Sequence, residues 1–368
     1  MKILYLSGYV IPSRKAHSIH IMRMSQALAQ KGHNVILFAY ASKQSRDFNL
    51  YAFYGTESDF DIELMSVPRV RGGTLLTLPR LRKRLLAHSR NDTLVYARSI
   101  YGALVAARLG FRIIYEAHWP PPNAWIHWLE KRLFAKASFQ KLVLISKSLE
   151  QTYRTCFGEM PCTEVCHDAA DIPPDKFSID YPWPCATDTL QIGYTGHLYA
   201  GRGIELILAC AARLPHYAFH IVGGLYQDIE RWADRGGTNV HFHGYVQPSL
   251  VQTVLSKCDV LLMPYQRNVS VGGKSIDTSN WMSPMKLFEY MASRRVIIAS
   301  DLPVLREILT PENSILVQPE SLEEWISAIE DCRDMRYRSR LADAAYQQFL
   351  ASHTWGQRAE KALSGVGL

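Results

Sequence analysis

Segment 283–292 carries the residue types from which a binding site for a phosphorylated ligand can be built. A serine and Pro284 precede an apolar run with helical spacing, which predicts that a helix begins near Pro284. Free backbone N–H groups at such a helix start attract an anion. Glu289 follows one turn later, within reach of hydroxyls on the same ligand. A phosphate next to vicinal hydroxyls describes a nucleoside diphosphate with its ribose. The N–H groups concerned are those of Met285, Lys286 and Leu287.

Two glycine-rich segments follow apolar runs and are expected to converge on that ligand. Segment 193–203 contains Arg202, whose forked guanidinium suits a phosphate. Segment 221–224 ends in two glycines. Lys286 is either a contact to the diphosphate, which we favour, or a solvated lysine at a helix start. The polar segment Gln266–Asn280 is predicted to be a loop that closes over the ligand, and it contains Gly272, Gly273 and Lys274.

Apolar runs alternate with helical patterns along the whole chain, which predicts an α/β fold with mostly parallel sheets. In the first half, a helix is expected at 19–31 and another at 125–137. The strands expected there are 3–6, 35–40, 62–67, 93–96, 112–116 and 141–145.

The proline-rich stretch 172–187 reads as a linker, and a second α/β series follows it. Ligands bind such sheets beyond the carboxyl ends of their strands. The strands expected in the second half are 190–194, 218–222, 240–243, 260–263 and 296–299, and the helices are 204–214, 229–233, 248–257, 284–293, 321–334 and 337–352.

The composition is that of a globular protein, with 48% apolar and 20% charged residues among 368. No apolar run is long enough to span a membrane, and seven unpaired-looking cysteines favour a reducing cytoplasm. The cluster of Cys156, Cys162, Cys166 and His167 has no recognised zinc spacing, and the lone Asp-x-Asp, at 59–61, falls in an expected surface loop. We therefore predict no metal site and no cofactor.

Positive charge is concentrated in the first half of the chain. Residues 1–185 contain 24 Lys and Arg against 15 Asp and Glu, whereas the whole chain has a net charge of +7. The densest stretch, Arg69–Arg90, interleaves leucines with basic residues at helical spacing. An ordinary surface helix is the preferred reading, and an amphipathic helix on an anionic membrane is the alternative. No nucleic-acid-binding module is recognisable, so nucleic acid is not an expected partner.

Together the motifs resemble those of GT-B glycosyltransferases, specifically the retaining family 4, and the resemblance covers nearly the whole chain. The stretch Ser-Pro-Met-Lys-Leu-Phe-Glu-Tyr-Met-Ala at 283–292 is similar to a subgroup variant of the family signature. The resemblance implies two Rossmann-like, doubly wound domains that face each other across a cleft. It assigns residues 1–180 to acceptor binding, 181–352 to donor binding and 353–368 to a helix that crosses back to the first domain.

The resemblance also implies the donor site. Arg202 stands for the lysine that contacts the diphosphate, and Glu289 matches the glutamate that binds the ribose. Trp281 occupies the place of the other signature glutamate, so contacts to the donor sugar must differ. The residues implied in donor binding are Gly196, His197, Arg202, Gly223, Tyr245, Ser283, Pro284, Met285, Lys286, Leu287 and Glu289.

On the acceptor side, the resemblance places Ala16, His17 and Ser18 where the family has a glycine-rich loop before its first helix. Glu116 and His118 lie at a strand end, where a family histidine is near the reacting sugar. His118, Arg202, Lys286 and Glu289 are therefore the expected catalytic residues.

The implied reaction is metal-independent, retaining transfer of a hexose from a UDP- or GDP-sugar to a hydroxyl of a glycan, a lipid-linked glycan or a small molecule. A cytoplasmic enzyme, at the inner membrane face in the membrane-bound case, is the expected setting. Two alternatives remain open: a nucleotide-sugar 2-epimerase of the same fold, and a non-catalytic subunit that binds nucleotide sugar. The substitution at Trp281 is the feature that favours the non-catalytic reading.

Overall fold

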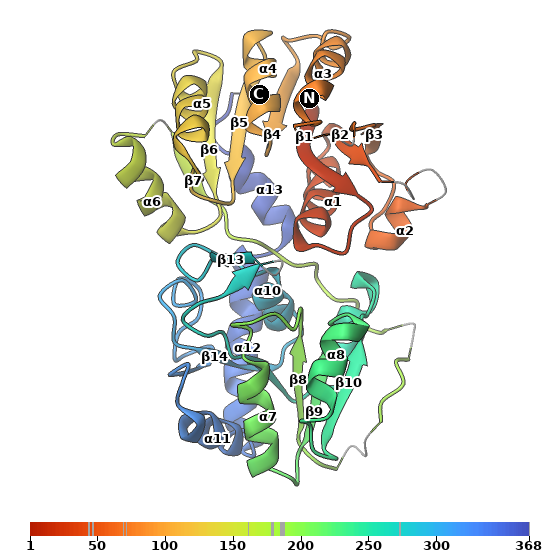
Figure 1. Cartoon of the computed structure of the whole chain (residues 1–368), viewed down its shortest axis with the longest axis vertical. Coiled ribbons are helices and arrows are strands. Elements are labelled where there is room, and N and C mark those ends of the chain that lie inside the picture. Colours follow the sequence, from red (N-terminus) through yellow and green to blue (C-terminus); the bar gives the residue numbers. More distant parts are fainter. Residues whose placement is uncertain are drawn as a thin grey trace. The chain divides into compact units, whose positions relative to one another are not determined.

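The computed structural model describes residues 1–368 except 43, 44, 46, 47, 69, 71, 161, 178, 179, 185–187, 272, 273 and 368. The chain divides into two compact units, each with one large parallel sheet covered by helices (Figure 1). The first unit combines Met1–His167 with Trp355–Leu368, and the second is Asp168–Thr354. The C-terminal helix therefore completes the fold of the N-terminal unit.

The first unit is built on a seven-stranded parallel sheet with the order β3-β2-β1-β4-β5-β6-β7. The strands are β1 (Lys2–Ile11), β2 (Asn34–Ala41), β3 (Asp61–Met65), β4 (Thr93–Ala97), β5 (Arg112–Ala117), β6 (Phe139–Leu144) and β7 (Thr163–Val165). The central strands are buried on both faces, and their sequences are correspondingly apolar for the most part, with Glu116 as a buried exception in β5.

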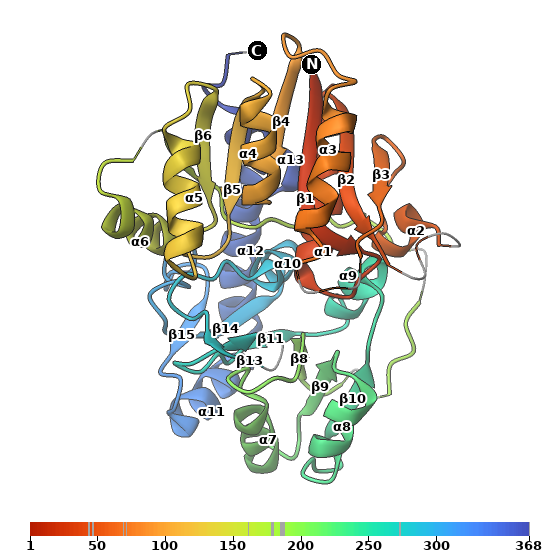
Figure 2. The same ribbon diagram turned by 45° about the horizontal axis from the view of Figure 1, so that its top comes forward.

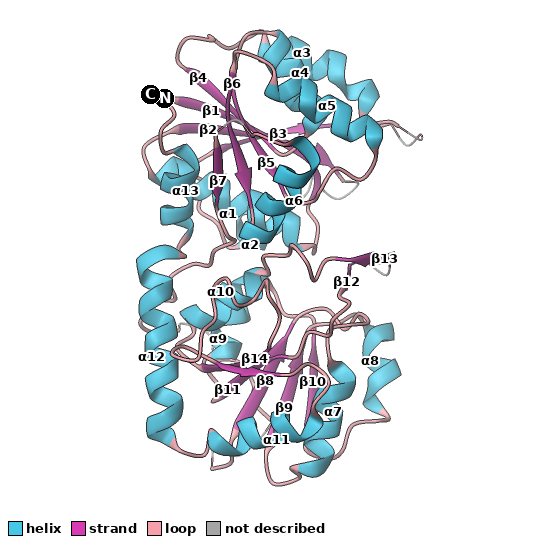
Figure 3. Ribbon diagram, turned by 90° about the vertical axis from the view of Figure 1, so that its left-hand side faces the viewer, coloured by secondary structure: helices cyan, strands magenta, loops and turns pink. Residues whose placement is uncertain are grey.

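Helices cover both faces of this sheet (Figures 2 and 3). On one face α4 packs between α3 and α5, and on the other α1 packs against α13. Side-chain caps begin four of these helices: Asn49 for α2, Ser99 for α4, Asn123 for α5 and Ser146 for α6. The helices are α1 (Ala16–Gln30), α2 (Leu50–Tyr54), α3 (Leu78–Leu85) with a preceding 3₁₀ turn η1 (Leu75–Thr77), α4 (Ile100–Arg108), α5 (Ala124–Phe134), α6 (Lys147–Phe157) and α13 (Trp355–Leu363).

The second unit contains a six-stranded parallel sheet with the order β10-β9-β8-β11-β14-β15, and a separate antiparallel pair, β12 and β13. The strands are β8 (Gln191–Thr195), β9 (Ala218–Val222), β10 (Val240–Gly244), β11 (Val260–Met263), β12 (Ser270–Val271), β13 (Lys274–Asp277), β14 (Val296–Ser300) and β15 (Ile315–Val317). The helices are α7 (Ile204–Arg213), α8 (Tyr226–Ala233), η2 (Pro248–Leu250), α9 (Val251–Leu255), α10 (Met285–Ala292), α11 (Leu322–Asp331) and α12 (Met335–Ser352).

Two hydrophobic cores sandwich this sheet, as the alternation along β11 shows. Val260 and Leu262 belong to the core formed with α7, α8 and α11. Leu261 and Met263 point the other way, into the core formed with α9, α10 and α12. Because both faces are buried, the strand is an unbroken apolar run, which is the pattern that predicted it.

The predicted α/β fold with two parallel sheets is confirmed, and two local expectations are corrected. The helix expected from Pro284 begins at Met285, with Pro284 as the residue before it in an extended conformation. The polar stretch 266–280, predicted to be a loop, contains the β12–β13 hairpin, because Val269 and Asp277 bond to each other across it. Gly272 and Gly273 lie outside the described residues, as does Arg69.

Candidate functional site

In the second unit, glycines allow three strand ends to approach one another closely. The N–H of Gly196, after β8, donates to the Val222 carbonyl oxygen at 2.9 Å, and the N–H of Gly223 donates to the Gly244 carbonyl oxygen at 2.7 Å. A β-carbon at Gly223 would lie 2.1 Å from the Gly196 carbonyl oxygen, and its φ of +115° also favours glycine. The segments at Gly196 and Gly223 therefore pack backbone against backbone at the carboxyl edge of the sheet, and we call this pair the glycine cradle.

Gly223→Ala is expected to lower the stability of the second unit by about 1–3 kcal/mol, because the new methyl group must push the Gly196 loop away. Calorimetric unfolding measures the effect. Gly244→Ala is the matched control, since Gly244 also has a positive φ of +70° but its β-carbon would meet nothing closer than 3.7 Å. Equal losses in both variants would show that backbone strain, and not the close approach, is responsible.

Two cationic side chains, Lys286 and Arg202, lie beside this cradle. The Lys286 Nζ donates to the Thr195 carbonyl oxygen at 3.0 Å and lies 4.0 Å from the centre of the Tyr194 ring. Its distance to the centre of the Tyr265 ring is 4.7 Å, and the Arg202 guanidinium lies over the same ring at 4.9 Å. Burial, followed by the nearby Arg202 charge, lowers the pKa of Lys286 well below its usual value. A bound anion would oppose both effects, because it favours the charged form of Lys286.

The start of α10 differs in one detail from the predicted anion site. The N–H of Leu287 donates to the Pro284 carbonyl oxygen at 2.9 Å, so it is not available to a ligand, contrary to expectation. The Ser283 Oγ accepts a bond from the Asp168 N–H at 2.8 Å, and it therefore anchors the helix start within the unit. Met285 and Lys286 remain the first two residues of the helix.

The predicted donor residues thus fall into two groups. Gly196, Gly223, Arg202 and Lys286 meet around the cradle, and Glu289 is close enough to Lys286 to raise its pKa against the burial effect. His197 instead stacks on Tyr199, with ring centres 4.7 Å apart, and Tyr245 follows β10. Trp281 is half-buried in the turn before α10.

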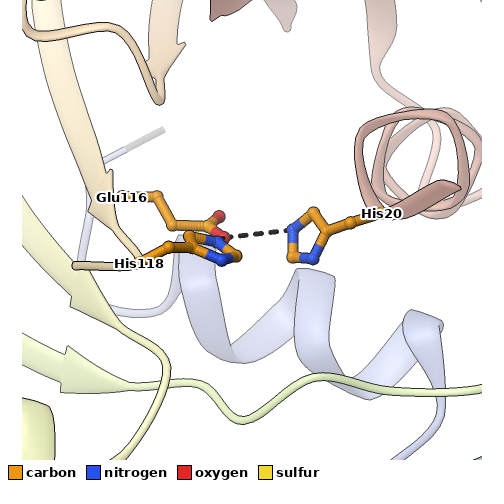
Figure 4. Close-up of side chains that lie close together, drawn as sticks. All are labelled: His20, Glu116 and His118. Atoms are coloured by element: carbon orange, nitrogen blue, oxygen red, sulfur yellow. Dashed lines mark hydrogen bonds and ion pairs between the residues drawn. The ribbon is translucent and has the colours of Figure 1, made fainter. Parts of the chain in front are cut away.

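In the first unit, Glu116 at the end of β5 is the centre of a buried polar cluster (Figure 4). One carboxylate oxygen, Oε1, bonds to His118 Nε2 and lies 3.0 Å from His20 Nε2. The other, Oε2, accepts a bond from the Tyr96 hydroxyl. His20 comes from α1 and Tyr96 from β4, so the cluster joins three neighbouring elements around one fully buried carboxylate.

Arg358 of α13 supplies the positive charge for this carboxylate. Its Nη2 lies 2.9 Å from Glu116 Oε1, and its Nε donates to the His167 carbonyl oxygen at 2.9 Å. Burial alone would raise the pKa of Glu116. The pKa is nevertheless held well below its usual value, chiefly by the Arg358 charge. Burial and the Arg98 charge lower the pKa of His118 to about 3. A neutral His118 that donates from Nε2 to an ionised Glu116 keeps Nδ1 as an acceptor.

The other acceptor-side residues predicted from the sequence belong to the first turn of α1 instead of to the loop before it. Ala16 opens the helix, and Ser18 Oγ bonds to the carbonyl oxygens of Ser13 and Lys15 at 2.8 and 2.7 Å. His17 stacks on Tyr9 with ring centres 4.1 Å apart, and burial lowers its pKa to about 4.

Among the described residues, one group of His, Cys, Asp and Glu has ligand atoms close enough to hold a metal ion, and it is His20, Glu116 and His118. The charges around it do not fit a metal. The Glu116 carboxylate is already neutralised by Arg358, and Arg98 adds a second guanidinium whose field reaches His118. A divalent cation would add to this buried positive charge, so we interpret the group as an ion-pair and hydrogen-bond network.

Glu130 on α5 is a second buried carboxyl in the same unit. It accepts bonds from the Tyr115 and Tyr153 hydroxyls, both at 3.0 Å, yet burial raises its pKa to about 7. A raised acid pKa contributes stability that is present below pH 4.5 and is lost as the pH rises through 7.

The free energy of unfolding of Glu130→Gln is therefore expected to gain about 1–3 kcal/mol relative to that of the wild type between pH 5 and pH 8. Denaturant titrations across that range measure it, and a constant difference would contradict the assignment.

Sequence reasoning missed His20, Tyr96, Arg98 and Arg358 in the first unit and Tyr265 in the second. Each lies on a regular helix, within a strand or next to one, and no distinctive motif surrounds it. Arg358 lies within the predicted C-terminal helix 353–368, and its place among buried residues of that helix was the available signal.

Comparison with known proteins agrees with the two-sheet fold. The chain is similar to sucrose-phosphate synthase from Thermosynechococcus elongatus (17% identity, 98% of this chain and 96% of the other, TM-score 0.71). HepE of Anabaena in complex with UDP is 15% identical over the full length of both chains, with a TM-score of 0.72. A glycosyltransferase from Rickettsia africae is 12% identical over 99% of both, with a TM-score of 0.74. At these identities the likeness shows the fold. No curated protein sequence matches the chain.

The two sheets and their cover of helices define a GT-B glycosyltransferase fold. The family model described as Glycosyltransferase Family 4 matches residues 17–167, and the one described as Glycosyl transferase-like matches 202–364. The chain belongs to glycosyltransferase family 4 and is an enzyme of the hexosyltransferase type. Among the described residues no helix has the length and hydropathy needed to cross a membrane.

Proposed function

We propose that the protein transfers a hexose, with retention of configuration, from a nucleoside-diphosphate sugar to a hydroxyl group. The observation that carries the proposal is the pairing of the glycine cradle at Gly196 and Gly223 with two cations, Arg202 and Lys286. We propose that the ligand lies along this backbone, and the cations suit a diphosphate. Glu289, one turn further along α10, is proposed to bind the ribose hydroxyls.

The difficult step is departure of the charged diphosphate while the sugar takes on oxocarbenium character. Arg202 and Lys286 would stabilise the charge that develops on the leaving oxygen, and the start of α10 adds its dipole. In other transferases a divalent metal stabilises the charge of the leaving diphosphate. We propose that the two fixed cations do so here and that the reaction is metal-independent.

For the acceptor, we propose attack from the face that the diphosphate leaves, with a phosphate oxygen as the proton acceptor. No protein nucleophile is then required. His118, held by Glu116 with Nδ1 as an acceptor, is proposed to contact the reacting sugar or the attacking hydroxyl.

Among the donors we propose UDP-sugars first and GDP-sugars second. HepE of Anabaena, which shares the fold, has been solved with UDP and with UDP-glucose. The acceptor is proposed to be a lipid-linked glycan on the cytoplasmic face of an anionic membrane, before a soluble glycan or small molecule. The basic stretch 69–90 favours this choice, because Arg80, Arg82 and Lys83 are exposed on α3.

The test is thermal unfolding of the protein with UDP, GDP, ADP and their common sugars, with and without EDTA. A rise in melting temperature with one nucleotide, unchanged by EDTA, is expected. A shift that EDTA abolishes would refute metal independence, and no shift with any nucleotide would refute the donor site.

Two variants then locate the site. Arg202→Ala and Glu289→Ala are each expected to abolish the thermal shift, and unchanged nucleotide affinity in both would refute the assignment. Slow hydrolysis of the donor sugar separates a transferase from a non-catalytic binding subunit, and release of the 2-epimer would indicate an epimerase.

A further inference from the structure

Exposed large apolar side chains gather on one part of the first unit. Along the described residues of the chain, six of the thirteen large apolar side chains that are clearly exposed fall between residues 75 and 128. Three are leucines around α3, and three are tryptophans in or just before α5. They are Leu75, Leu76, Leu86, Trp119, Trp125 and Trp128.

Except for Trp119, which lies in the bend after β5, these residues belong to the helices of one layer or directly flank them. Helix α4 packs between α3 and α5, and the three helices lie side by side over the same face of the sheet (Figures 2 and 3). Both α3 and α5 begin after the carboxyl end of a strand, so Leu75, Leu76 and Trp125 come from the same end of the layer. The exposed apolar side chains are thus spread over neighbouring helices.

Helix α5 buries one apolar side and exposes tryptophans on the other. Leu129, Glu130 and Leu133 face the core, whereas the outward stripe begins with two tryptophans. Trp125 and Trp128 are 56% and 42% exposed, and their rings stack with centres 4.9 Å apart. A soluble surface rarely displays two stacked indoles, because the exposed apolar area has no compensating contact.

The rest of the stripe is basic. Arg132 lies over the Trp128 ring at 4.6 Å, and Lys131 is exposed beside it. Between residues 72 and 137, all of which are described, Asp92 is the one exposed acidic residue. The exposed basic residues in the same stretch are Arg80, Arg82, Lys83, Arg90, Arg108, Lys131, Arg132 and Lys136. The surface combines apolar anchors with a one-sided positive charge.

We infer that the outer surface of α3, α4 and α5 binds an anionic lipid bilayer, and that Trp125 and Trp128 are its principal anchor. Indole rings settle at the headgroup level, leucines reach the acyl boundary, and Lys and Arg bind anionic lipid. The inference extends the proposed transfer to a lipid-linked acceptor by naming the surface, although the binding itself does not depend on sugar transfer. In this inference the main contact with the membrane is made by α5, whereas the sequence alone indicated the basic stretch 69–90.

Sedimentation of the full chain with phosphatidylcholine vesicles, with and without phosphatidylglycerol, tests the inference. The wild type is expected to bind only the vesicles with phosphatidylglycerol, and to bind less at high salt. The double variant Trp125→Ser, Trp128→Ser is expected to lose about tenfold in affinity. Lys131→Ser is expected to lose about fivefold.

The matched control is Leu225→Ser, Tyr226→Ser, which removes two exposed apolar side chains (51% and 76% exposed) from the second unit. It should bind vesicles like the wild type. Melting temperature and the UDP-induced shift, measured without vesicles, show that every variant is folded and can bind nucleotide. The inference would be overturned if the wild type did not bind vesicles, or if the tryptophan variant bound them as tightly as the wild type does. Normal vesicle binding without nucleotide binding would instead refute the proposed function.

Discussion

Arg358→Ala is expected to destabilise the first unit by about 3–5 kcal/mol. The variant leaves the fully buried Glu116 carboxylate without the guanidinium that lies 2.9 Å from its Oε1. It also removes the bond from Arg358 to the His167 carbonyl oxygen. Calorimetry and denaturant titration, followed as separate transitions of the two units, measure the loss. The transition of the second unit should not move.

The double variant Glu116→Gln, Arg358→Met is the control for this experiment. It removes both charges at nearly constant volume, so it is expected to be more stable than Arg358→Ala alone. If the double variant were as unstable as the single one, the loss would come from packing of α13 and not from the uncompensated carboxylate. A loss below about 1 kcal/mol in Arg358→Ala would contradict the ion pair itself.

The second large effect is on ligand binding. Lys286→Ala is expected to weaken UDP binding by about 10- to 100-fold, because a charge-assisted bond to phosphate is lost. In the wild type, burial and Arg202 lower the pKa of Lys286, and a bound diphosphate would raise it again. Binding should therefore take up a proton, and affinity should fall as the pH rises between the two pKa values. Titration calorimetry in buffers of different ionisation enthalpy measures both quantities.

Arg213→Ala is the matched control for Lys286→Ala. Arg213 is exposed in the same unit and pairs with Glu323 at 2.9 Å, so its removal changes net charge equally without touching the cradle. UDP affinity should stay within about twofold of the wild type in this variant. Should Arg213→Ala and Lys286→Ala weaken binding equally, long-range charge would explain the effect, and Lys286 would not contact the diphosphate.

The fold could be predicted from the sequence because its strands are buried on both faces. Val260–Met263 and Ala218–Val222 were predicted with the bounds that the structure has, since an apolar run between polar turns marks such a strand. Helix ends were less certain. Pro284 was expected as the first helical residue, whereas its extended ψ of 117° places it just outside α10. Local sequence does not decide between those two positions.

The candidate site of the second unit could also be predicted in part, because glycines at strand ends and a helix start are visible in the chain. The cluster in the first unit could not. Glu116 and Arg358 are 242 residues apart, and nothing in either local sequence indicates the other. His20 looks like an ordinary polar residue on a helix until α1 packs against α13. Such pairs depend on tertiary packing.

The membership of α13 in the first unit has a consequence for biogenesis. Strands and helices of residues 1–167 leave the ribosome first, yet Glu116 can pair with Arg358 only after the second unit, Asp168–Thr354, has been translated. Until then burial of Glu116 favours its protonated form, because the Arg358 charge that lowers its pKa is missing. The N-terminal half is thus a late-maturing domain, and its final folding step follows synthesis of the C-terminal half.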